Sequence, residues 1–592
     1  MTANLSRRGR ALRLRALALV AVAVGLLWVF KAPLIDAVAD VAFLPVATTR
    51  PAQYAVSTQH GVAMKTRDGV VLRADIHRPI GLVKAPTILA RIPFTDTLWN
   101  RTRSDVISRF WAKRGYVVVV QGTRGRYRSD GEFTPMVHER QDGLDTLAWL
   151  ARQSWWDGRL AMWGGSAFGQ TQWAISDRTD PGVGAFAIQI ASSRFQDFFH
   201  PGGAFALESS LYWALNSAGP RDQDVDLKAL DRGERALPVS RADDVARSDT
   251  GFFDQWLTSA PGSSYWVAID GHERASTAKA PALLLGGWYD PFLPGMLRDY
   301  EALSQNKHAR DTRLVIGPFS HAREIDWPGQ AKPVLYRRAS VEQVIAWYDQ
   351  VLGVGQRPTP QPRVRLYVMG PNFWRDEQEW PLARTRYTRL YLQANGRLGK
   401  AAPDINAAED RFTYDPRTPT PTRGGAMLGP RAGVAMQEPV GTRADVLNYV
   451  TPPLSSPLEI TGPLKAKIWV TTDAPSTDFT AKLSFITPKG EAFNLGDGII
   501  RRAFTPGERT PLEIDLGATS VVLEAGSKLR LDISSSNFPR FDRNPNTGES
   551  PATATRFATA HQEVWRSVDA ASYIILPEIP KEDTKTQGLR RP

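Results

Sequence analysis

The chain has 592 residues, enough for three or four domains, and its 42% hydrophobic residues with about 15% Gly plus Pro exclude a low-complexity chain. It contains no cysteine, which excludes disulfide frameworks, thiolate metal sites and cysteine nucleophiles. The formal net charge is +12, but +6 lies in the first 31 residues and +2 in the last dozen, so we expect no nucleic acid among the partners of the folded body.

Residues 1–39 are predicted to be a signal peptide or a membrane anchor. Ala16 to Phe30 are fifteen consecutive apolar or glycine residues, which suits a signal-peptide core better than a full span of roughly 20 residues. Ala37-Val38-Ala39 offers small residues for cleavage, whereas Trp28 suits an anchor that stays in the membrane. The basic flank keeps the amino terminus cytoplasmic, so we expect the rest of the chain to be exported and to meet the membrane only through this segment.

Between residues 55 and 195, short apolar strands alternate with helices. A turn at Arg67-Asp68-Gly69 separates two extended runs within residues 64–79, which indicates an antiparallel hairpin. Further elements are predicted as strands at residues 87–90, 116–121 and 160–163 and a helix at residues 142–153. Strand, helix and strand in this order are typical of a parallel sheet covered by helices.

Residues 196–277 break this alternation, because they are helix-prone and lack strand signals. We therefore predict a helical cap inserted into the sheet domain. Strands resume at residues 282–285 and 314–316, and a helix at residues 341–352 closes the domain, whose second part spans residues 278–352.

A Pro/Gly-rich connector at residues 353–362 marks the clearest domain boundary. Beyond it, residues 363–578 have the pattern of an all-β domain. One strand is predicted where Leu529, Leu531 and Ile533 alternate with Arg530, Asp532 and Ser534, which indicates a single buried face. Recurrent turn signals between such strands favour a sandwich of the jelly-roll type.

A serine between glycines follows the strand at residues 160–163. Ser166 lies in Gly164-Gly165-Ser166-Ala167-Phe168-Gly169 and precedes a helix-compatible stretch. This is typical of a nucleophile elbow, where glycines permit the tight turn and the helix amino terminus directs N–H groups at the reacting centre. The second glycine lies three rather than two residues after the serine, so a simple Gly/Ser turn is the alternative interpretation of this motif alone.

An aspartate and a histidine follow Ser166 in the chain order that α/β-hydrolases use. Asp290 comes just after the strand at residues 282–285, and His321 just after the strand at residues 314–316. We expect His321 to take the hydroxyl proton of Ser166 as general base and Asp290 to orient the imidazole. The oxyanion is expected to bind the backbone N–H of Ala167 and a second donor from the loop after residues 87–90.

These motifs resemble the cocaine esterase and X-prolyl dipeptidyl-peptidase family of serine hydrolases, over about residues 55–578. The resemblance implies an α/β-hydrolase domain with a helical cap, a jelly-roll domain, and hydrolysis of esters or amides through an acyl-enzyme on Ser166, with Asp290 and His321. Independently of the resemblance, the sequence shows neither a phosphate-binding Gly-rich loop with lysine nor a His/carboxylate cluster at metal spacing, so no metal or cofactor is expected. The matching segments are Arg67-Asp68-Gly69, His77-Arg78-Pro79, Gly164 to Gly169, Trp288-Tyr289-Asp290, Gly317 to His321, Thr477 to Ala481, Phe493 to Gly498 and Ser534 to Gly548.

The oxyanion hole is where this sequence departs from the family. In the esterase branch, the loop presents a tyrosine hydroxyl at the position that Phe94 occupies here, and a phenyl ring has no donor. Thr95 is the nearby hydroxyl and a candidate replacement. Loss of one oxyanion donor costs roughly 10²–10³ in rate, so either another group substitutes or turnover is slow.

Three functions are therefore open at this stage. The first is a serine hydrolase that cleaves small-molecule or short-peptide acyl substrates. The second is an X-Pro dipeptidyl-peptidase, which needs an anionic group to hold the amino terminus of its substrate. The third, from a different class, is an envelope-tethered binding protein with a catalytically weak site; Phe94 favours it, and the set of Ser166, Asp290 and His321 argues against it.

Overall fold

The computed structural model describes residues 50–218, 225–270, 272–354, 361–403 and 408–580. The segment interpreted as a signal peptide or anchor, residues 1–39, lies outside these ranges. None of the helices within them combines the length and the apolar character that crossing a bilayer requires.

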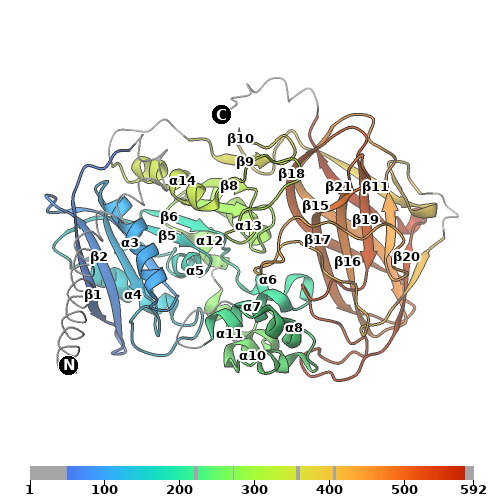
Figure 1. Ribbon diagram of the computed structural model, residues 1–592, viewed down its shortest axis with the longest axis horizontal. Coiled ribbons are helices and arrows are strands. Elements are labelled where there is room, and N and C mark those ends of the chain that lie inside the picture. The colour runs from blue at the N-terminus through green and yellow to red at the C-terminus, as the bar shows by residue number, and fades with distance from the viewer. Residues whose placement is uncertain (1–49, 219–224, 271, 355–360, 404–407, 581–592) are drawn as a thin grey trace, which may run out of the picture.

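A ten-stranded sheet forms the first half of the molecule (Figure 1), in the order β1-β2-β4-β3-β5-β6-β7-β8-β9-β10. Strands β3 to β9 pair in parallel with their neighbours, whereas β1, β2 and β10 are antiparallel. The strands are β1 (Val56–Lys65), β2 (Val71–Pro79), β3 (Ala85–Ile92), β4 (Val117–Gly122), β5 (Trp156–Gly165), β6 (Ala185–Gln189), β7 (Ala282–Gly287), β8 (Arg313–Gly317), β9 (Val364–Val368) and β10 (Phe373–Glu377).

The hairpin prediction is confirmed, because β1 and β2 pair across the Arg67-Asp68-Gly69 turn with Lys65 opposite Val71. The central strands are buried on both faces, as continuous apolar runs such as that of β4 indicate. Adjacent residues point to opposite faces of a strand, so Val118 and Val119 belong to two different cores.

Helices cover the two faces. On the Val118 side lie α3 (Leu98–Ala112) and α14 (Tyr336–Val351). On the Val119 side lie α4 (Glu139–Leu150), α5 (Ala167–Trp173) and α13 (Leu293–Ser304). The helices predicted at residues 142–153 and 341–352 correspond to α4 and α14, each of which begins a few residues earlier than predicted.

The described residues between β6 and β7 contain helices and no strand. Figure 1 shows α7, α8, α10 and α11 below the two sheets. Helix α7 contacts both halves of the molecule, because the Ser217 carbonyl accepts from the Arg126 guanidinium and Glu208 N–H donates to the carbonyl of Pro539. Their own core includes Leu211, Leu230, Phe253 and Trp256. The helices are α6 (Gln196–Phe199), α7 (Leu207–Ser217), α8 (Leu227–Glu234), α9 (Ala242–Val245), α10 (Gly251–Thr258), α11 (Ser264–Ile269) and α12 (His272–Thr277).

The carboxy-terminal part is all-β, and its strands form an 11-stranded sheet system on the right of Figure 1. Residues 464–468 of β15 alternate in burial, because Leu464, Ala466 and Ile468 are buried while Lys465 is exposed. The strands are β11 (Arg386–Gln393), β12 (Arg397–Gly399), β13 (Asp410–Tyr414), β14 (Leu447–Val450), β15 (Leu458–Thr472), β16 (Ser476–Ile486), β17 (Ala492–Ala503), β18 (Thr510–Leu523), β19 (Lys528–Ser534), β20 (Ala560–Trp565) and β21 (Tyr573–Glu578).

The predicted start of the all-β domain at residue 363 does not coincide with the end of the first sheet. Strand β9 pairs in parallel with β8, and β10 pairs with β9, so residues 364–377 extend the first sheet beyond the Pro/Gly-rich connector. The reason is that Val364, Leu366 and Val368 are buried and complete the core of that sheet. A connector rich in Pro and Gly marks a change of element, and here the next element returns to the same sheet.

The prediction that the strand at Leu529 has a single buried face is wrong. Strand β19 is buried on both faces, because Arg530, Asp532 and Ser534 are only 4%, 8% and 5% exposed. The Arg530 guanidinium donates to the Asp532 carboxylate and to the carbonyl oxygen of Glu438, so the polar face is covered by the chain itself. Paired charges allow polar residues to be buried where alternation predicts a solvent-exposed face.

Candidate active site

The turn between β5 and α5 holds Ser166 in a strained backbone conformation. Its φ of 57° and ψ of −128° lie outside the regions that non-glycine residues ordinarily occupy. The backbone is held on both sides, because Ser166 N–H donates to the carbonyl of Gln189 at 2.9 Å and Ser166 carbonyl accepts from Gly169 at 2.8 Å. A strained serine at a strand-to-helix turn is the geometry of a nucleophile elbow.

The glycines explain why the spacing of the elbow differs from the usual one. A Cβ on Gly164, whose φ is +143°, would lie 2.4 Å from the Cβ of Phe168. A Cβ on Gly169 would lie 2.6 Å from the Cβ of Ala191, which follows β6. The glycine that lets α5 approach the sheet is therefore three residues after Ser166.

The structure brings the three predicted side chains together at the carboxyl end of the parallel sheet. His321 Nε2 lies 2.9 Å from Ser166 Oγ, and His321 Nδ1 lies 2.9 Å from Asp290 Oδ2. Asp290 is 1% exposed, and its other oxygen accepts the backbone N–H of Phe292 at 2.8 Å. With the Nδ1 proton donated to Asp290, Nε2 is free to accept the proton of the Ser166 hydroxyl.

The loops that carry Asp290 and His321 are bonded to each other through their backbones. Trp288 N–H donates to the carbonyl of Gly317 at 3.1 Å, and Tyr289 N–H donates to the carbonyl of Phe319 at 2.9 Å. These backbone bonds hold the Asp290 loop and the His321 loop at a fixed separation without any side-chain contact.

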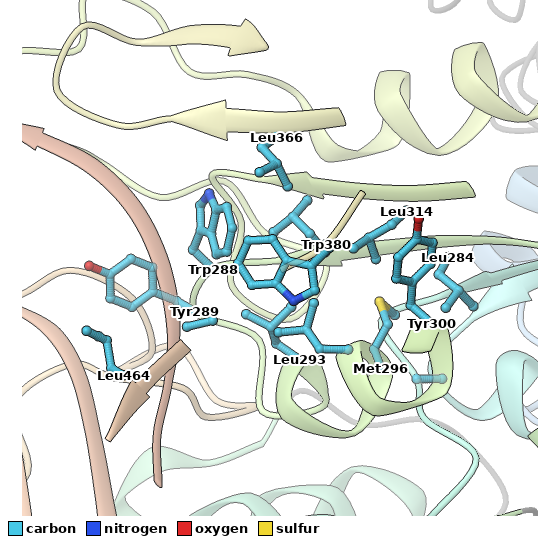
Figure 2. Close-up of a cluster of buried hydrophobic side chains, with 14 of the residues drawn as sticks. Leu284, Trp288, Tyr289, Leu293, Met296, Tyr300, Leu314, Leu366, Trp380 and Leu464 are labelled. Atoms are coloured by element: carbon cyan, nitrogen blue, oxygen red, sulfur yellow. The ribbon is translucent and has the colours of Figure 1, made fainter. Parts of the chain in front are cut away.

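The side chains of Trp288 and Tyr289 anchor the Asp290 loop in opposite directions. Trp288 Nε1–H donates to the carbonyl of Tyr367 in β9, and the Tyr289 hydroxyl donates to the carbonyl of Asn494 in β17, both at 2.8 Å. Figure 2 shows Trp288 beside Trp380 in the apolar cluster where the first sheet meets the all-β domain. Thus the all-β domain supports the loop that carries Asp290.

Aromatic side chains cover the imidazole from the helical side. The Phe292 ring lies 5.5 Å from the His321 ring, centroid to centroid. Phe292 is itself stacked on Phe195 and Phe198, at 5.6 and 4.6 Å. No sequence motif predicted these aromatic contacts with His321; the signal that could have indicated them is the density of phenylalanines after residue 194.

Across the described residues, no three His, Asp or Glu side chains gather as metal ligands would.

Ala167 and Phe94, the residues predicted for the oxyanion hole, line one hollow beside Ser166. Ala167 is the first residue of α5, where backbone N–H groups have no partner within a helix, and it lines a hollow of about 10 Å³ together with Phe94. The Phe94 ring packs edge-on against Phe168, with centroids 5.5 Å apart. Thr95 is 4% exposed and lines neither this hollow nor the cavity that reaches Ser166, so the structure does not support it as a replacement donor.

A buried carboxylate joins α13, the helix after Asp290, to the loop that follows β6. Asp299 of α13 is 4% exposed and accepts the backbone N–H and the hydroxyl of Ser193, at 2.7 and 2.5 Å. Burial raises the pKa of Asp299 to about 7, in spite of the hydrogen bonds from Ser193 that lower it. Asp299 thus binds a proton in the folded state over a range in which an unfolded aspartate is ionised.

Comparison with known proteins identifies relatives over most of the chain. Residues 68–323 match the X-Pro dipeptidyl-peptidase (S15 family), and residues 357–574 match the X-Pro dipeptidyl-peptidase C-terminal non-catalytic domain. Cocaine esterase from Rhodococcus sp. (strain MB1 Bresler) is 34% identical over 580 residues, which cover 89% of this chain and 99% of that protein.

Two solved structures share the fold. An aminopeptidase from a marine sediment Thaumarchaeota archaeon has a TM-score of 0.75 at 24% identity, over 89% of this chain and 97% of its own. An α-amino acid ester hydrolase has a TM-score of 0.74 at 22% identity, over 88% of this chain and 96% of its own. The arrangement of the two halves is therefore that of known hydrolases.

We expect Asp299→Asn to flatten the dependence of stability on pH. Between about pH 4 and 7 the folded protein retains a proton on Asp299 that the unfolded chain has released, so the wild type loses stability as pH rises through this window. Asparagine does not titrate there and can still accept the Ser193 N–H. Urea unfolding at several pH values measures this; a constant wild-type-minus-variant difference from pH 4 to 7 would contradict the raised pKa.

Proposed function

Because the chain belongs to the cocaine esterase and X-Pro dipeptidyl-peptidase family of serine hydrolases, we propose that it hydrolyses small ester or amide substrates through an acyl-enzyme on Ser166. The observation that carries this proposal is the continuous pair of hydrogen bonds from Ser166 Oγ through His321 to Asp290. A binding protein without catalysis does not fit a family whose members are hydrolases.

The proposed reaction has two steps. In the first, Ser166 Oγ attacks the carbonyl carbon while its proton passes to His321 Nε2; the bond to the leaving group then breaks, and His321 gives the proton to the departing oxygen or nitrogen. In the second, water attacks the acyl-enzyme, again with His321 as base, and Ser166 Oγ recovers its proton. Asp290 stabilises the imidazolium in both steps, and the Ala167 N–H stabilises the oxyanion.

Ester substrates are supported ahead of X-Pro peptides by the charges around Ser166. An X-Pro dipeptidyl-peptidase needs a free anionic group for the amino terminus of its substrate. Among the described residues that line the two cavities beside Ser166 and Ala167, Glu139 is the one carboxylate, and it lies 2.9 Å from the Arg91 guanidinium. That carboxylate is already paired.

We further propose that residues 1–39 direct the export of an α/β-hydrolase domain with a helical cap at residues 196–277, followed by a jelly-roll domain. The antiparallel pairings of β15, β16 and β19 support the jelly roll, and the arginine-rich apolar start supports export. We expect the full chain in the membrane or extracytoplasmic fraction of a bacterial host and a chain lacking residues 1–39 in the cytoplasm. Equal distribution of the two would contradict export.

We expect a fluorophosphonate to label Ser166 and to abolish ester hydrolysis. The reagent forms a bond only with an activated serine, so the site is read by mass spectrometry of the labelled peptide. Ser166→Ala should remain folded and unlabelled, which provides the control. A folded wild-type protein that hydrolyses esters without labelling at Ser166 would refute the assignment.

We expect Phe94→Tyr to raise kcat on a short-chain aryl ester by at least tenfold. The substitution adds a hydroxyl at the position where the esterase branch presents one, and one oxyanion donor contributes roughly 10²–10³ in kcat. Phe94→Leu adds no donor and should bring no increase. An unchanged kcat in Phe94→Tyr would mean that a hydroxyl at this position does not reach the oxyanion.

A further inference from the structure

A cavity of about 210 Å³ lies beside Ser166, on the face of the sheet that α3 and α14 cover. It is distinct from the hollow beside Ala167 on the other side of Phe94. Its wall is mostly apolar, with side chains from β3, β4 and α3: Ile88, Ile92, Val118, Val120, Ile107 and Trp111.

The cavity is closed at one end and open at the other. Ile88, Trp111 and Val118 are 1%, 1% and 3% exposed, so this end lies within the core between the sheet and α3. Arg103 and Ala322 are exposed and mark the end that faces solvent. Ser166 and His321 also line the cavity, so a group bonded to Ser166 Oγ can extend into it.

Neither of the other spaces near the site offers comparable room to both reacting side chains. The hollow of about 10 Å³ beside Ala167 holds no more than a water molecule, because Phe94 and Trp213 fill that side. A cavity of about 350 Å³ between the helical segment and β17 has Asp290 in its wall but neither Ser166 nor His321. Of these three spaces, the cavity on the α3 side of the sheet is therefore the one that joins both reacting side chains to an apolar space.

We propose that this cavity binds the acyl chain of the ester substrate, and that the substrates are esters of apolar carboxylic acids. This inference rests on the function proposed above. The order of the two steps selects the acyl group as the occupant. The alcohol must leave and water must enter before the second step, which requires the open end. The acyl group stays bonded to Ser166 Oγ throughout, so it can occupy the closed end.

The volume sets the expected chain length. An apolar cavity of about 150 Å³ accepts benzene, so about 210 Å³ corresponds to an acyl chain of about eight carbons. Each methylene buried in the cavity should strengthen transition-state binding about fourfold. Longer chains meet Trp111 and Val118 at the closed end.

The test compares p-nitrophenyl esters from acetate to dodecanoate, with alkyl acetates as a second series in which only the alcohol grows. We expect kcat/KM to rise about fourfold per methylene along the acyl series until about eight carbons and then to fall. The alkyl acetates should show no such rise. Alkylboronic acids, which bond to Ser166 in the acyl position, should give inhibition constants that follow the same profile.

Two variants of α3 move the profile in opposite directions. Ser108→Leu adds bulk in the cavity wall at a residue that is 1% exposed, so the ratio of octanoate to acetate kcat/KM should fall at least tenfold. Ile107→Ala enlarges the cavity and should move the optimum to longer chains, which keeps the test valid if Ser108→Leu does not fold. Thr102→Leu adds similar bulk on the same helix outside the cavity and should retain the wild-type ratio.

The outcomes separate this inference from the proposed function. A flat acyl profile, or a rise along the alkyl acetates alone, in a protein that fluorophosphonate labels at Ser166 would overturn the acyl-site inference and leave the serine hydrolase assignment standing. Absence of labelling at Ser166 would instead refute the proposed function itself.

Discussion

The hydrogen bond between His321 Nδ1 and Asp290 Oδ2 is the contact on which the arrangement of this site depends. It orients the imidazole, and only that orientation places Nε2 within 2.9 Å of Ser166 Oγ. The two residues lie on separate loops at the carboxyl ends of β7 and β8, so the bond requires the loops to keep a fixed separation. Backbone bonds from Trp288 and Tyr289 to the neighbouring loop meet this requirement.

The sequence was sufficient to predict those features of the fold and site that depend on local patterns. The β1–β2 hairpin, the central strands and the helix after Ser166 have signals within a few residues, and Ser166, Asp290 and His321 each follow a predicted strand. The structure adds that the three side chains lie within hydrogen-bond distance. The oxyanion hole stays a prediction: Ala167 and Phe94 line the same hollow, whereas Thr95 lines neither that hollow nor the cavity at Ser166, because a neighbour in sequence need not share a cavity wall.

Features that depend on distant segments were not predictable in this way. Strands β9 and β10 return to the first sheet because β8 offers an unpaired edge, which no pattern within residues 363–378 reveals. The polar face of β19 is buried because Arg530 finds partners in Asp532 and Glu438, and the second of these lies 92 residues away. The phenylalanines that cover His321 come from separate parts of the chain, because Phe195 and Phe198 follow β6 whereas Phe292 follows β7. In each case tertiary contacts decide between arrangements that local sequence allows equally.

The hydrogen bond from the Tyr289 hydroxyl to the carbonyl of Asn494 has a consequence for the order of events during synthesis. The ribosome completes all three reacting residues by position 321, but the loop that carries Asp290 lacks this support until position 494 has emerged. A nascent or truncated chain that ends before β17 therefore has the reacting residues without the complete scaffold. The carboxy-terminal domain, whose family description is non-catalytic, thereby couples the formation of the site to the completion of the polypeptide.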